Sequence, residues 1–127
     1  MPEGASDPRP LVLVVDDDPA VTNLLERSLE TEGYRVRCAS SAVGGVSLAW
    51  SEERPSVIVI DITIPDVDGF DVAARLRSHP RSADIPLIFM STRSGLKDRR
   101  AARGAQNFLI KPFRPSQLIQ MLRKLPA

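Results

Sequence analysis

Five short runs of β-branched and other apolar residues recur along the chain at fairly even spacing, with helical patterns between them. The first run, Leu11 to Val15, and the third, Val57 to Ile60, are apolar at every position, as strands covered on both faces must be. Strict alternation of strands and helices indicates a parallel sheet with right-handed crossovers. We therefore expect an α/β fold with strands at 11–15, 34–38, 57–60, 87–90 and 108–110.

Capping residues indicate where the helices begin and end. Asp18 before Pro19 is a favourable N-cap followed by proline at the first helical position, and Gly33 is a favourable stop. Ser41 is a candidate cap of the second helix. The single histidine, His79, follows the third helix and is expected to be exposed and inert.

The spacing of apolar residues predicts which face of each helix is buried. A third helix is expected over about 70–78, a fourth near 96–103 with few apolar residues, and a fifth from Pro115. The predicted inner faces are Val21, Leu24, Leu25, Ser28 and Leu29 in the first helix, Val43, Val46 and Trp50 in the second, Phe70, Ala73, Ala74 and Leu76 in the third, and Leu118, Ile119, Leu122 and Leu125 in the fifth.

Length and charge limit the class of protein. The 127 residues fit one compact domain, and we expect a flexible tail over 1–10 followed by the domain over 11–127. The net charge of +1 gives no global electrostatic reason to expect nucleic acid or an acidic membrane as the partner. The single cysteine, Cys38, cannot form an internal disulfide and is expected to pack as a small core residue. With no apolar run of membrane-spanning length and no signal peptide, a cytoplasmic protein without membrane insertion is the expectation.

Ionisable or hydroxyl side chains follow four of the five predicted strands. Asp16 and Asp17 follow the first strand, Asp61 the third, Ser91 the fourth and Lys111 the fifth. In a parallel α/β sheet ligands bind beyond the carboxyl ends of the strands, so these side chains should meet at one edge. Carboxylates packed together repel one another, and a divalent cation such as Mg²⁺ offsets that repulsion. The sequence therefore predicts a magnesium pocket in which a lysine and a hydroxyl complete the partners of a phosphoryl group.

Each of these residues also has an ordinary structural interpretation. An aspartate after a strand is commonly a turn former or a helix N-cap, and we favour the N-cap for Asp18. Taken alone, Asp61 would more often be a turn residue than a nucleophile, and a lysine before a proline would be a surface residue. Their occurrence at successive strand ends favours one shared site.

With these residues in place, the chain resembles the response-regulator receiver domain of two-component signalling, in particular its single-domain, chemotaxis-regulator-like members. The resemblance covers nearly all of residues 11–125 and implies a five-stranded parallel sheet in the order 2-1-3-4-5, with helices on both faces. The motifs that carry it are Val14-Val15-Asp16-Asp17-Asp18-Pro19, the run from Val57 through Asp61 to Pro65, Asp66, Asp68 and Gly69, the run from Pro86 to Ser91, and Gly104-Ala105 through Phe108 to Lys111-Pro112-Phe113.

The resemblance implies a role for each site residue. Asp61 would accept a phosphoryl group from a histidine kinase or histidine phosphotransfer protein, in a reaction that needs Mg²⁺ or Mn²⁺. Asp17 would bind the metal directly and Asp16 through water. Thr63 would bind it through its backbone carbonyl, with Asp61 completing the set. Lys111 would pair with the phosphoryl group.

Phosphorylation would also change the surface of the domain. Ser91 would move inward to bond the phosphoryl oxygens, and Phe108 would turn into the vacated space, although a plain core role for Phe108 is equally open. The altered surface would be that of the fourth helix, fifth strand and fifth helix, where a downstream protein would bind. The chain would catalyse only its own phosphorylation and dephosphorylation, and no motif for direct nucleic-acid binding is present.

Three further features bear on the site and its surroundings. The peptide bond between Lys111 and Pro112 would be cis, as in the family. Thr92 stands where the family usually has alanine or glycine, and with Thr63 it is expected to control access to the acceptor. Arg114 stands where an acidic or small residue often precedes the last helix, so a possible cap is lost.

Two other functions stay open at this point. The pair Asp16 and Asp18 after an apolar strand resembles the nucleophile motif of haloacid-dehalogenase-type phosphatases, in which Asp16 would form the aspartyl phosphate and Asp18 would act as acid and base. Against it, no acidic pair follows the lysine-bearing strand, and Asp61 would have no role. The other alternative is a phosphorylation-independent adaptor with receiver architecture.

Overall fold

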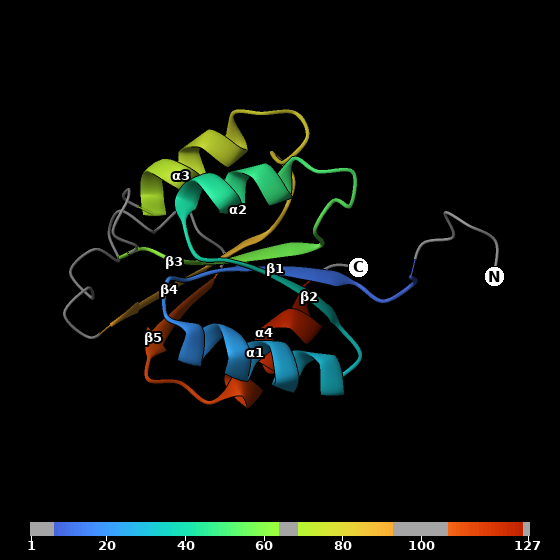
Figure 1. Cartoon of the computed structure of the whole chain (residues 1–127), viewed down its shortest axis with the longest axis vertical. Coiled ribbons are helices and arrows are strands. Elements are labelled where there is room, and N and C mark those ends of the chain that lie inside the picture. The colour runs from blue at the N-terminus through green and yellow to red at the C-terminus, as the bar shows by residue number, and fades with distance from the viewer. Residues whose placement is uncertain (1–6, 64–68, 93–106, 126–127) are drawn as a thin grey trace.

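The computed structural model describes residues 7–63, 69–92 and 107–125. They form one parallel sheet of five strands in the order β2-β1-β3-β4-β5, with α2 and α3 on one face and α1 and α4 on the other (Figure 1). This confirms the predicted fold class and strand order. The elements along the chain are β1 (Leu11–Val15), α1 (Pro19–Thr31), β2 (Arg35–Ala39), α2 (Ala42–Ala49), β3 (Val57–Asp61), α3 (Gly69–Arg77), β4 (Leu87–Thr92), β5 (Asn107–Lys111) and α4 (Pro115–Lys124).

The strand registers bring residues from distant parts of the sequence to the carboxyl edge. Strands β1 and β3 are neighbours at the centre of the sheet, and Val15 pairs with Ile60. The next residues, Asp16 and Asp61, therefore lie side by side. On the other side of β3, β4 and β5 pair so that Thr92 lies opposite Lys111. The sheet thus delivers an acidic pair and a lysine to one edge.

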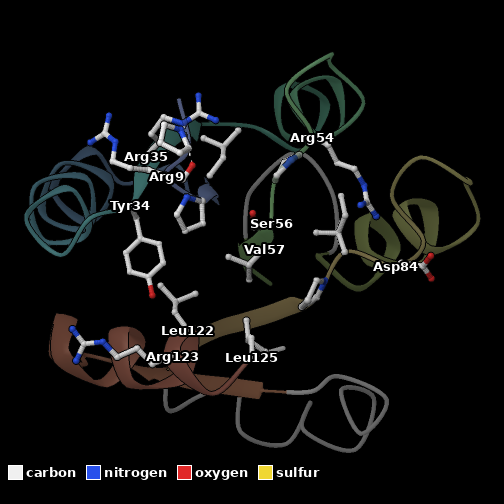
Figure 2. Close-up of a pocket in the computed structure, with 16 residues that line it drawn as sticks. Arg9, Tyr34, Arg35, Arg54, Ser56, Val57, Asp84, Leu122, Arg123 and Leu125 are labelled. Carbon is white, nitrogen blue, oxygen red and sulfur yellow. Dashed lines mark hydrogen bonds between the residues drawn. The ribbon is translucent and has the colours of Figure 1, made fainter. Parts of the chain in front are cut away.

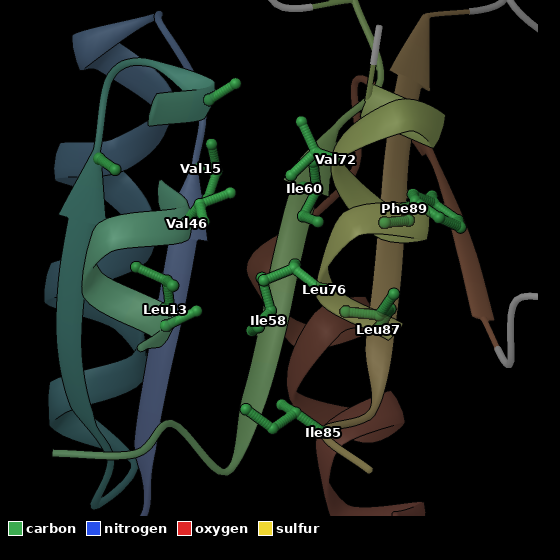
Figure 3. Packing of buried hydrophobic residues seen from close by; sticks show 14 of the residues in the cluster. Leu13, Val15, Val46, Ile58, Ile60, Val72, Leu76, Ile85, Leu87 and Phe89 are labelled. Carbon is green, nitrogen blue, oxygen red and sulfur yellow. The ribbon is translucent and has the colours of Figure 1, made fainter. Parts of the chain in front are cut away.

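Apolar side chains cover both faces of the sheet. One cluster lies beneath α2 and α3 and includes Leu13, Ile58 and Leu76 (Figure 3). The second lies beneath α1 and α4 and includes Leu25 and Leu118. Because β1 and β3 supply residues to both clusters in alternation, they are apolar at every position, which is the pattern that identified them in the sequence.

The capping predictions are confirmed. Asp18 Oδ1 accepts a hydrogen bond from the Ala20 amide at 2.9 Å, and Ser41 Oγ accepts one from the Gly44 amide at 3.1 Å. Gly33 ends α1 with a φ of 94°, a conformation that favours glycine. Before α4, the Arg114 side chain makes no cap hydrogen bond, and Gln117 Oε1 accepts a hydrogen bond from the Arg114 amide instead.

Several predicted inner-face residues are wrong. Leu24 is 51% exposed and Val43 is 73% exposed, and Ala74 also faces solvent. In α2 the buried residues are Ala42, Gly45, Val46 and Ala49, and in α3 Val72 is buried with Ala73 and Leu76. The expected fourth helix at 96–103 and the Phe70 side chain lie outside the described residues.

The environment of His79 also differs from the prediction. The His79 ring lies 4.5 Å from the Trp50 ring, centroid to centroid, and His79 Nδ1 accepts a hydrogen bond from the Arg81 amide at 3.1 Å. The Trp50 indole donates to Ser82 Oγ at 3.0 Å. His79 is therefore half-buried between the C-terminal ends of α2 and α3, where its ring packs against Trp50.

The predicted N-terminal tail is partly described, from Asp7 onward. The Pro10 carbonyl accepts a hydrogen bond from the Arg35 amide at 2.9 Å, which joins the tail to the start of β2. Among the described residues, no helix is long and apolar enough to cross a membrane.

Candidate functional site

Lys111 joins two aspartates at the carboxyl edge of the sheet. Its Nζ lies 2.7 Å from Asp16 Oδ2 and 2.7 Å from Asp61 Oδ2. The two carboxylates are almost completely buried, with side-chain exposures of 0% and 5%, and the lysine side chain is 18% exposed. A lysine that bridges two buried carboxylates offsets part of the cost of desolvating them and of their mutual repulsion.

The second oxygen of each carboxylate is held by the loop that follows its strand. Asp16 Oδ1 accepts from the Asp18 amide at 2.9 Å. Asp61 Oδ1 accepts from the Thr63 amide at 2.8 Å and from the Thr63 hydroxyl at 2.6 Å. These contacts fix the orientation of both carboxylates before any ligand binds.

The surroundings shift the pKa values of the three groups in different directions. Burial raises the pKa of Asp61, but the hydrogen bonds from Lys111 and Thr63 outweigh it, so the pKa lies below its ordinary value. For Asp16 burial dominates, and the bond from Lys111 only partly offsets it, so its pKa is raised. Burial lowers the pKa of Lys111, but its bonds to both aspartates outweigh that effect and raise it. Asp61 is therefore ionised and Lys111 is protonated at neutral pH.

Asp17 completes a group of carboxylates that suits a hard cation. Asp16, Asp17 and Asp61 each offer a carboxylate oxygen, and these oxygens lie within 4.8 Å of one another. Oxygen ligands are those that Mg²⁺ prefers, and a site built from carboxylates usually keeps positions for water and phosphate oxygens. Asp17 is exposed, unlike the other two, so a cation held here would be open to solvent on its side. The residues present therefore fit a magnesium ion.

The remaining predicted residues surround this group. Ser91 is fully buried, and its hydroxyl donates to the Thr92 carbonyl at 3.2 Å. Phe108 packs on the cluster beneath α2 and α3, with its ring 6.5 Å from that of Phe89. Thr92 is exposed at the end of β4. The Lys111–Pro112 peptide bond is cis, as predicted.

An apolar hollow beside the site was not anticipated. It has a volume of about 410 Å³ and is lined by Leu24 and Val21 of α1, by Phe113 of the loop after β5, and by Lys111 itself. The signal in the sequence is Leu24 itself, an apolar residue on the stripe that α1 presents. The pattern alone does not separate Leu24, which lines the hollow, from Leu25 and Leu29, which are buried in the core.

Known proteins are similar to this chain in sequence and in fold. The family described as response regulator receiver domain matches residues 12–123. The DNA-binding dual master transcriptional regulator RpaA of a Synechocystis species is 36% identical over 118 residues, which cover 91% of this chain and 48% of that protein. The transcriptional regulatory protein PrrA of Mycobacterium leprae is 39% identical over 127 residues, covering 98% and 52%. The chain thus spans about half the length of these curated relatives.

One solved structure is similar to this chain over almost the whole length of both proteins. The chemotaxis response regulator CheY4 of Vibrio cholerae has a TM-score of 0.81 and 28% identity, with 91% of this chain and 98% of that chain covered. Sequence, strand order and three-dimensional similarity therefore lead to one assignment. The chain belongs to the response regulator receiver domain family of two-component systems.

Proposed function

We propose that this domain accepts a phosphoryl group on Asp61 from a histidine kinase or a histidine phosphotransfer protein, with a divalent cation bound nearby. The observation that carries the proposal is the pairing of ionised Asp61 with Lys111 inside a group of three carboxylates. An ionised carboxylate is a nucleophile, and a fixed ammonium beside it stabilises the charge of an incoming phosphoryl group. Family membership supports the same role.

The transfer exchanges one bond to phosphorus for another. An oxygen of Asp61 attacks phosphorus, the O–P bond forms, and the P–N bond to the donor imidazole breaks. The electron pair of that bond returns to the imidazole nitrogen. Lys111 stays protonated throughout and turns from a carboxylate partner into a partner of the phosphoryl oxygens.

Asp16, Asp17 and Asp61, with the Thr63 carbonyl, would hold the magnesium ion, which supplies positive charge to the phosphoryl oxygens. Asp16 and Asp61 are already oriented by backbone amides, so binding needs little rearrangement of these side chains. Thr63, which contacts Asp61, and Thr92, which ends β4, are both exposed, and we assign them the control of access to the acceptor.

The apolar hollow beside Lys111 supports docking of the phosphodonor at this edge. Leu24 is 51% exposed and lines the hollow together with Val21 and Phe113, so these apolar side chains form one patch next to Lys111. A donor helix seated on Leu24 and Phe113 would bring its phosphohistidine toward Asp61. We therefore assign the donor contact to α1 and the loop after β5.

We also propose that phosphorylation is read through Ser91 and Phe108. Ser91 follows Met90, the β4 partner of Asp61, and Phe108 pairs with Phe89 on the same sheet face. A phosphoryl group that drew the Ser91 hydroxyl inward would change the space available to the Phe108 ring. The predicted surface for a downstream target is that of the helix expected near 96–103, β5 and the helix from Pro115, which is α4 of the structure. That target, a cytoplasmic location, a domain boundary at residue 11 and the absence of any further enzymatic activity stay predictions.

The direct test is incubation with a small phosphodonor, such as acetyl phosphate or phosphoramidate, in the presence and absence of Mg²⁺. Mass spectrometry after borohydride reduction should place the acyl phosphate on Asp61. The Asp61→Asn variant should not be modified, while Asp18→Asn, which keeps an N-cap side chain, should behave as the parent.

Modification of Asp16 would instead support the phosphatase alternative. In the structure the Asp18 carboxylate caps α1, so the residue that would act as acid and base in the phosphatase motif is engaged in helix capping. A protein that no small phosphodonor modifies would overturn the proposal and favour the adaptor alternative.

A further inference from the structure

A large groove lies at the amino-terminal ends of the strands, opposite the acidic site at their carboxyl ends. Its volume is about 940 Å³. The two sites occupy opposite ends of the same strand, since Val57 at the start of β3 lines the groove and Asp61 at the end of β3 belongs to the acidic site. The groove therefore stands apart from every residue assigned above to phosphoryl transfer.

The floor of the groove is apolar and its wall is partly aromatic. Leu11, Val57 and Ile85 form part of the lining, and each is no more than 5% exposed. Tyr34 and Leu125 are half-buried and stand at the side (Figure 2). Such a surface suits insertion of one or two apolar side chains from a ligand.

The rim of the groove is rich in arginine. Arg9, Arg35, Arg54 and Arg123 line it, against one carboxylate among the lining residues, Asp84. In Figure 2 the arginines come from different sides of the hollow. Groups separated in this way do not converge on a single phosphate, but they match carboxylates spaced along an extended peptide.

The present partners of these arginines are easily exchanged. Arg9 pairs with Asp7 at 2.7 Å and Arg123 with Glu32 at 2.8 Å, and both pairs are exposed. Exposed ion pairs contribute little to stability, so a ligand carboxylate can replace one at small cost.

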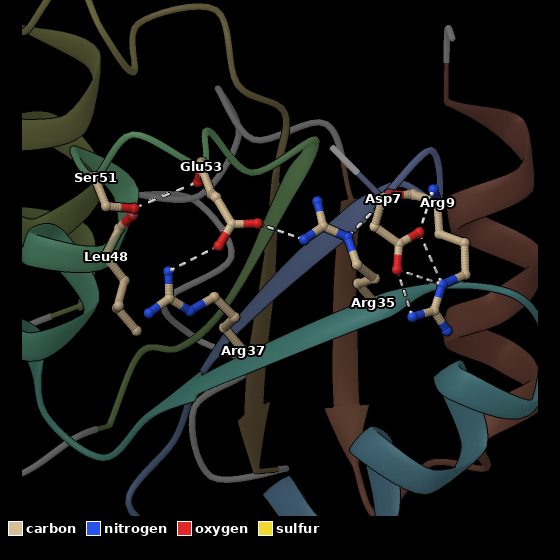
Figure 4. Close-up of polar contacts among 7 residues, drawn as sticks. All are labelled: Asp7, Arg9, Arg35, Arg37, Leu48, Ser51 and Glu53. Carbon is tan, nitrogen blue, oxygen red and sulfur yellow. Dashed lines mark hydrogen bonds and ion pairs between the residues drawn. The ribbon is translucent and has the colours of Figure 1, made fainter. Parts of the chain in front are cut away.

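Around the other two arginines, the ion pairs among the described residues do not give each guanidinium a carboxylate of its own. Arg35 shares the Glu53 carboxylate with Arg37 (Figure 4), so two guanidinium groups have one counter-charge there. Arg54 donates its Nε–H to the Arg81 carbonyl at 3.0 Å, and no ion pair of Arg54 or Arg81 occurs in the described part of the chain.

We propose that this groove binds an acidic segment of a partner protein, with apolar residues of the segment on the floor and its carboxylates on the arginine rim. Arginine and tyrosine are enriched where proteins bind one another, and complementary charge sets the choice of partner. The groove and the acceptor lie at opposite ends of the strands. We therefore expect the segment to bind with equal affinity to the phosphorylated and unphosphorylated protein. The surface would hold a partner in place without responding to the signal.

The test uses a fluorescein-labelled peptide in which glutamate alternates with leucine, long enough to span the groove. Fluorescence anisotropy measures affinity, and ¹⁵N–¹H spectra of the full chain locate the contact. We expect saturable binding that shifts the amides of Tyr34, Ser56 and Leu125 and leaves those of Asp17 and Lys111 unchanged. The matched peptide with glutamine in place of glutamate should bind about tenfold more weakly or worse.

Charge reversal identifies the groove. Arg123→Glu, on the exposed side of α4, and the double variant with Arg54→Glu should each weaken binding by about tenfold or more. Arg27→Glu, an equal charge change on an exposed residue of α1 outside the groove, should leave binding unchanged. Backbone spectra of the variants report folding, and Arg123→Glu alone carries the test if Arg54→Glu disturbs the fold.

Other outcomes overturn the proposal. Equal loss in Arg27→Glu would make the attraction non-specific, and shifts confined to the acidic edge would move the contact elsewhere. Displacement of the peptide by inorganic phosphate at equal concentration would point to a small anion. A concentration-dependent dimer that blocks the peptide would point to a second copy of the chain. A change in affinity on adding beryllium fluoride with Mg²⁺ would show that the two edges are coupled.

Discussion

The ammonium of Lys111 lies 2.7 Å from the carboxylate of Asp61, although the residues are 50 positions apart in the chain. The same ammonium lies 2.7 Å from Asp16, so one lysine contacts two buried carboxyl groups. Both contacts arise because β1, β3 and β5 run parallel and end at one edge. This lysine therefore stabilises both carboxylates, and it is also the residue that we propose as a partner of the phosphoryl group.

Replacing Lys111 by methionine should destabilise the protein in the absence of divalent cations. The side chain keeps its length and loses its charge, which leaves Asp16 and Asp61 close together without compensation. We expect the free energy of unfolding to fall by about 2 kcal/mol or more, since breaking a buried ion pair from one side is costly. Urea unfolding with a chelator measures it.

The loss should shrink when Mg²⁺ is added, because a cation replaces the missing charge. Lys124→Met, an exposed lysine in the last turn of α4, serves as the matched control and should change stability little. Equal effects of the two substitutions would contradict the assigned role of Lys111.

Asp17 should control metal affinity with little effect on stability. It is the exposed member of the carboxylate group, so its charge costs little in the apo protein and remains available to a cation. Asp17→Asn should weaken Mg²⁺ binding by about tenfold or more, the scale at which even outer partners of a metal act. Isothermal titration calorimetry measures the affinity for Mg²⁺. The control is Asp18→Asn, which removes the same charge one residue away, and a similar loss of affinity in both variants would exclude a specific ligand role for Asp17.

Much of the fold was predictable because its signals are local. The apolar runs of β1 and β3 reflect burial on both faces, and Asp18, Gly33 and Ser41 act through hydrogen bonds or backbone angles within a few residues. The acidic site was predictable for a related reason. Parallel strands bring their carboxyl ends together, so residues after the strands had to meet.

The phase of the helices was not predictable in the same way. Helix α2 reads Ala42 to Ala49 with serine as its one hydroxyl residue, so both of its faces are apolar and no pattern distinguishes them. Packing against β1 determines which face of α2 is buried, since it buries Gly45 and leaves Val43 exposed to solvent. In α3 the choice between Val72 and Ala74 was likewise made by contact with the sheet. The burial of His79 is not predictable from local sequence, because its ring contact with Trp50 joins residues 29 positions apart.

Gly45 is expected to tolerate no side chain. A Cβ built there would lie 2.7 Å from Val15 Cγ2, a distance that real contacts do not show. Gly45→Ala should therefore destabilise the protein by about 1–3 kcal/mol, even though alanine favours a helix. Adding Val15→Ala should recover part of the loss by making room. Thermal unfolding of both variants decides, and a more stable Gly45→Ala protein would show that β1 and α2 separate easily.

Thr92 should lengthen the life of the phosphorylated form. It ends β4 opposite Lys111, on the exposed side of the site. If its side chain hinders water on the way to the acyl phosphate, Thr92→Ala should lose phosphate severalfold faster, while Thr92→Ser should fall between. The rate of phosphate release after removal of the donor measures this, and equal rates in the three proteins would refute the access role.

Cys38 should react slowly with thiol reagents over the neutral pH range. Burial, with smaller contributions from Glu26 and Glu30, raises the pKa of its thiol to about 11. The thiolate is the reactive form, so at pH 7.5 about one molecule in several thousand is reactive. Because the folded-state pKa lies above the ordinary value, the alkylation rate should keep rising about tenfold per pH unit beyond pH 9, where an unfolded chain levels off. Iodoacetamide labelling of native and urea-unfolded protein across this range tests it, and a native rate that levels off near pH 9 would place the thiol in contact with water rather than beneath α1.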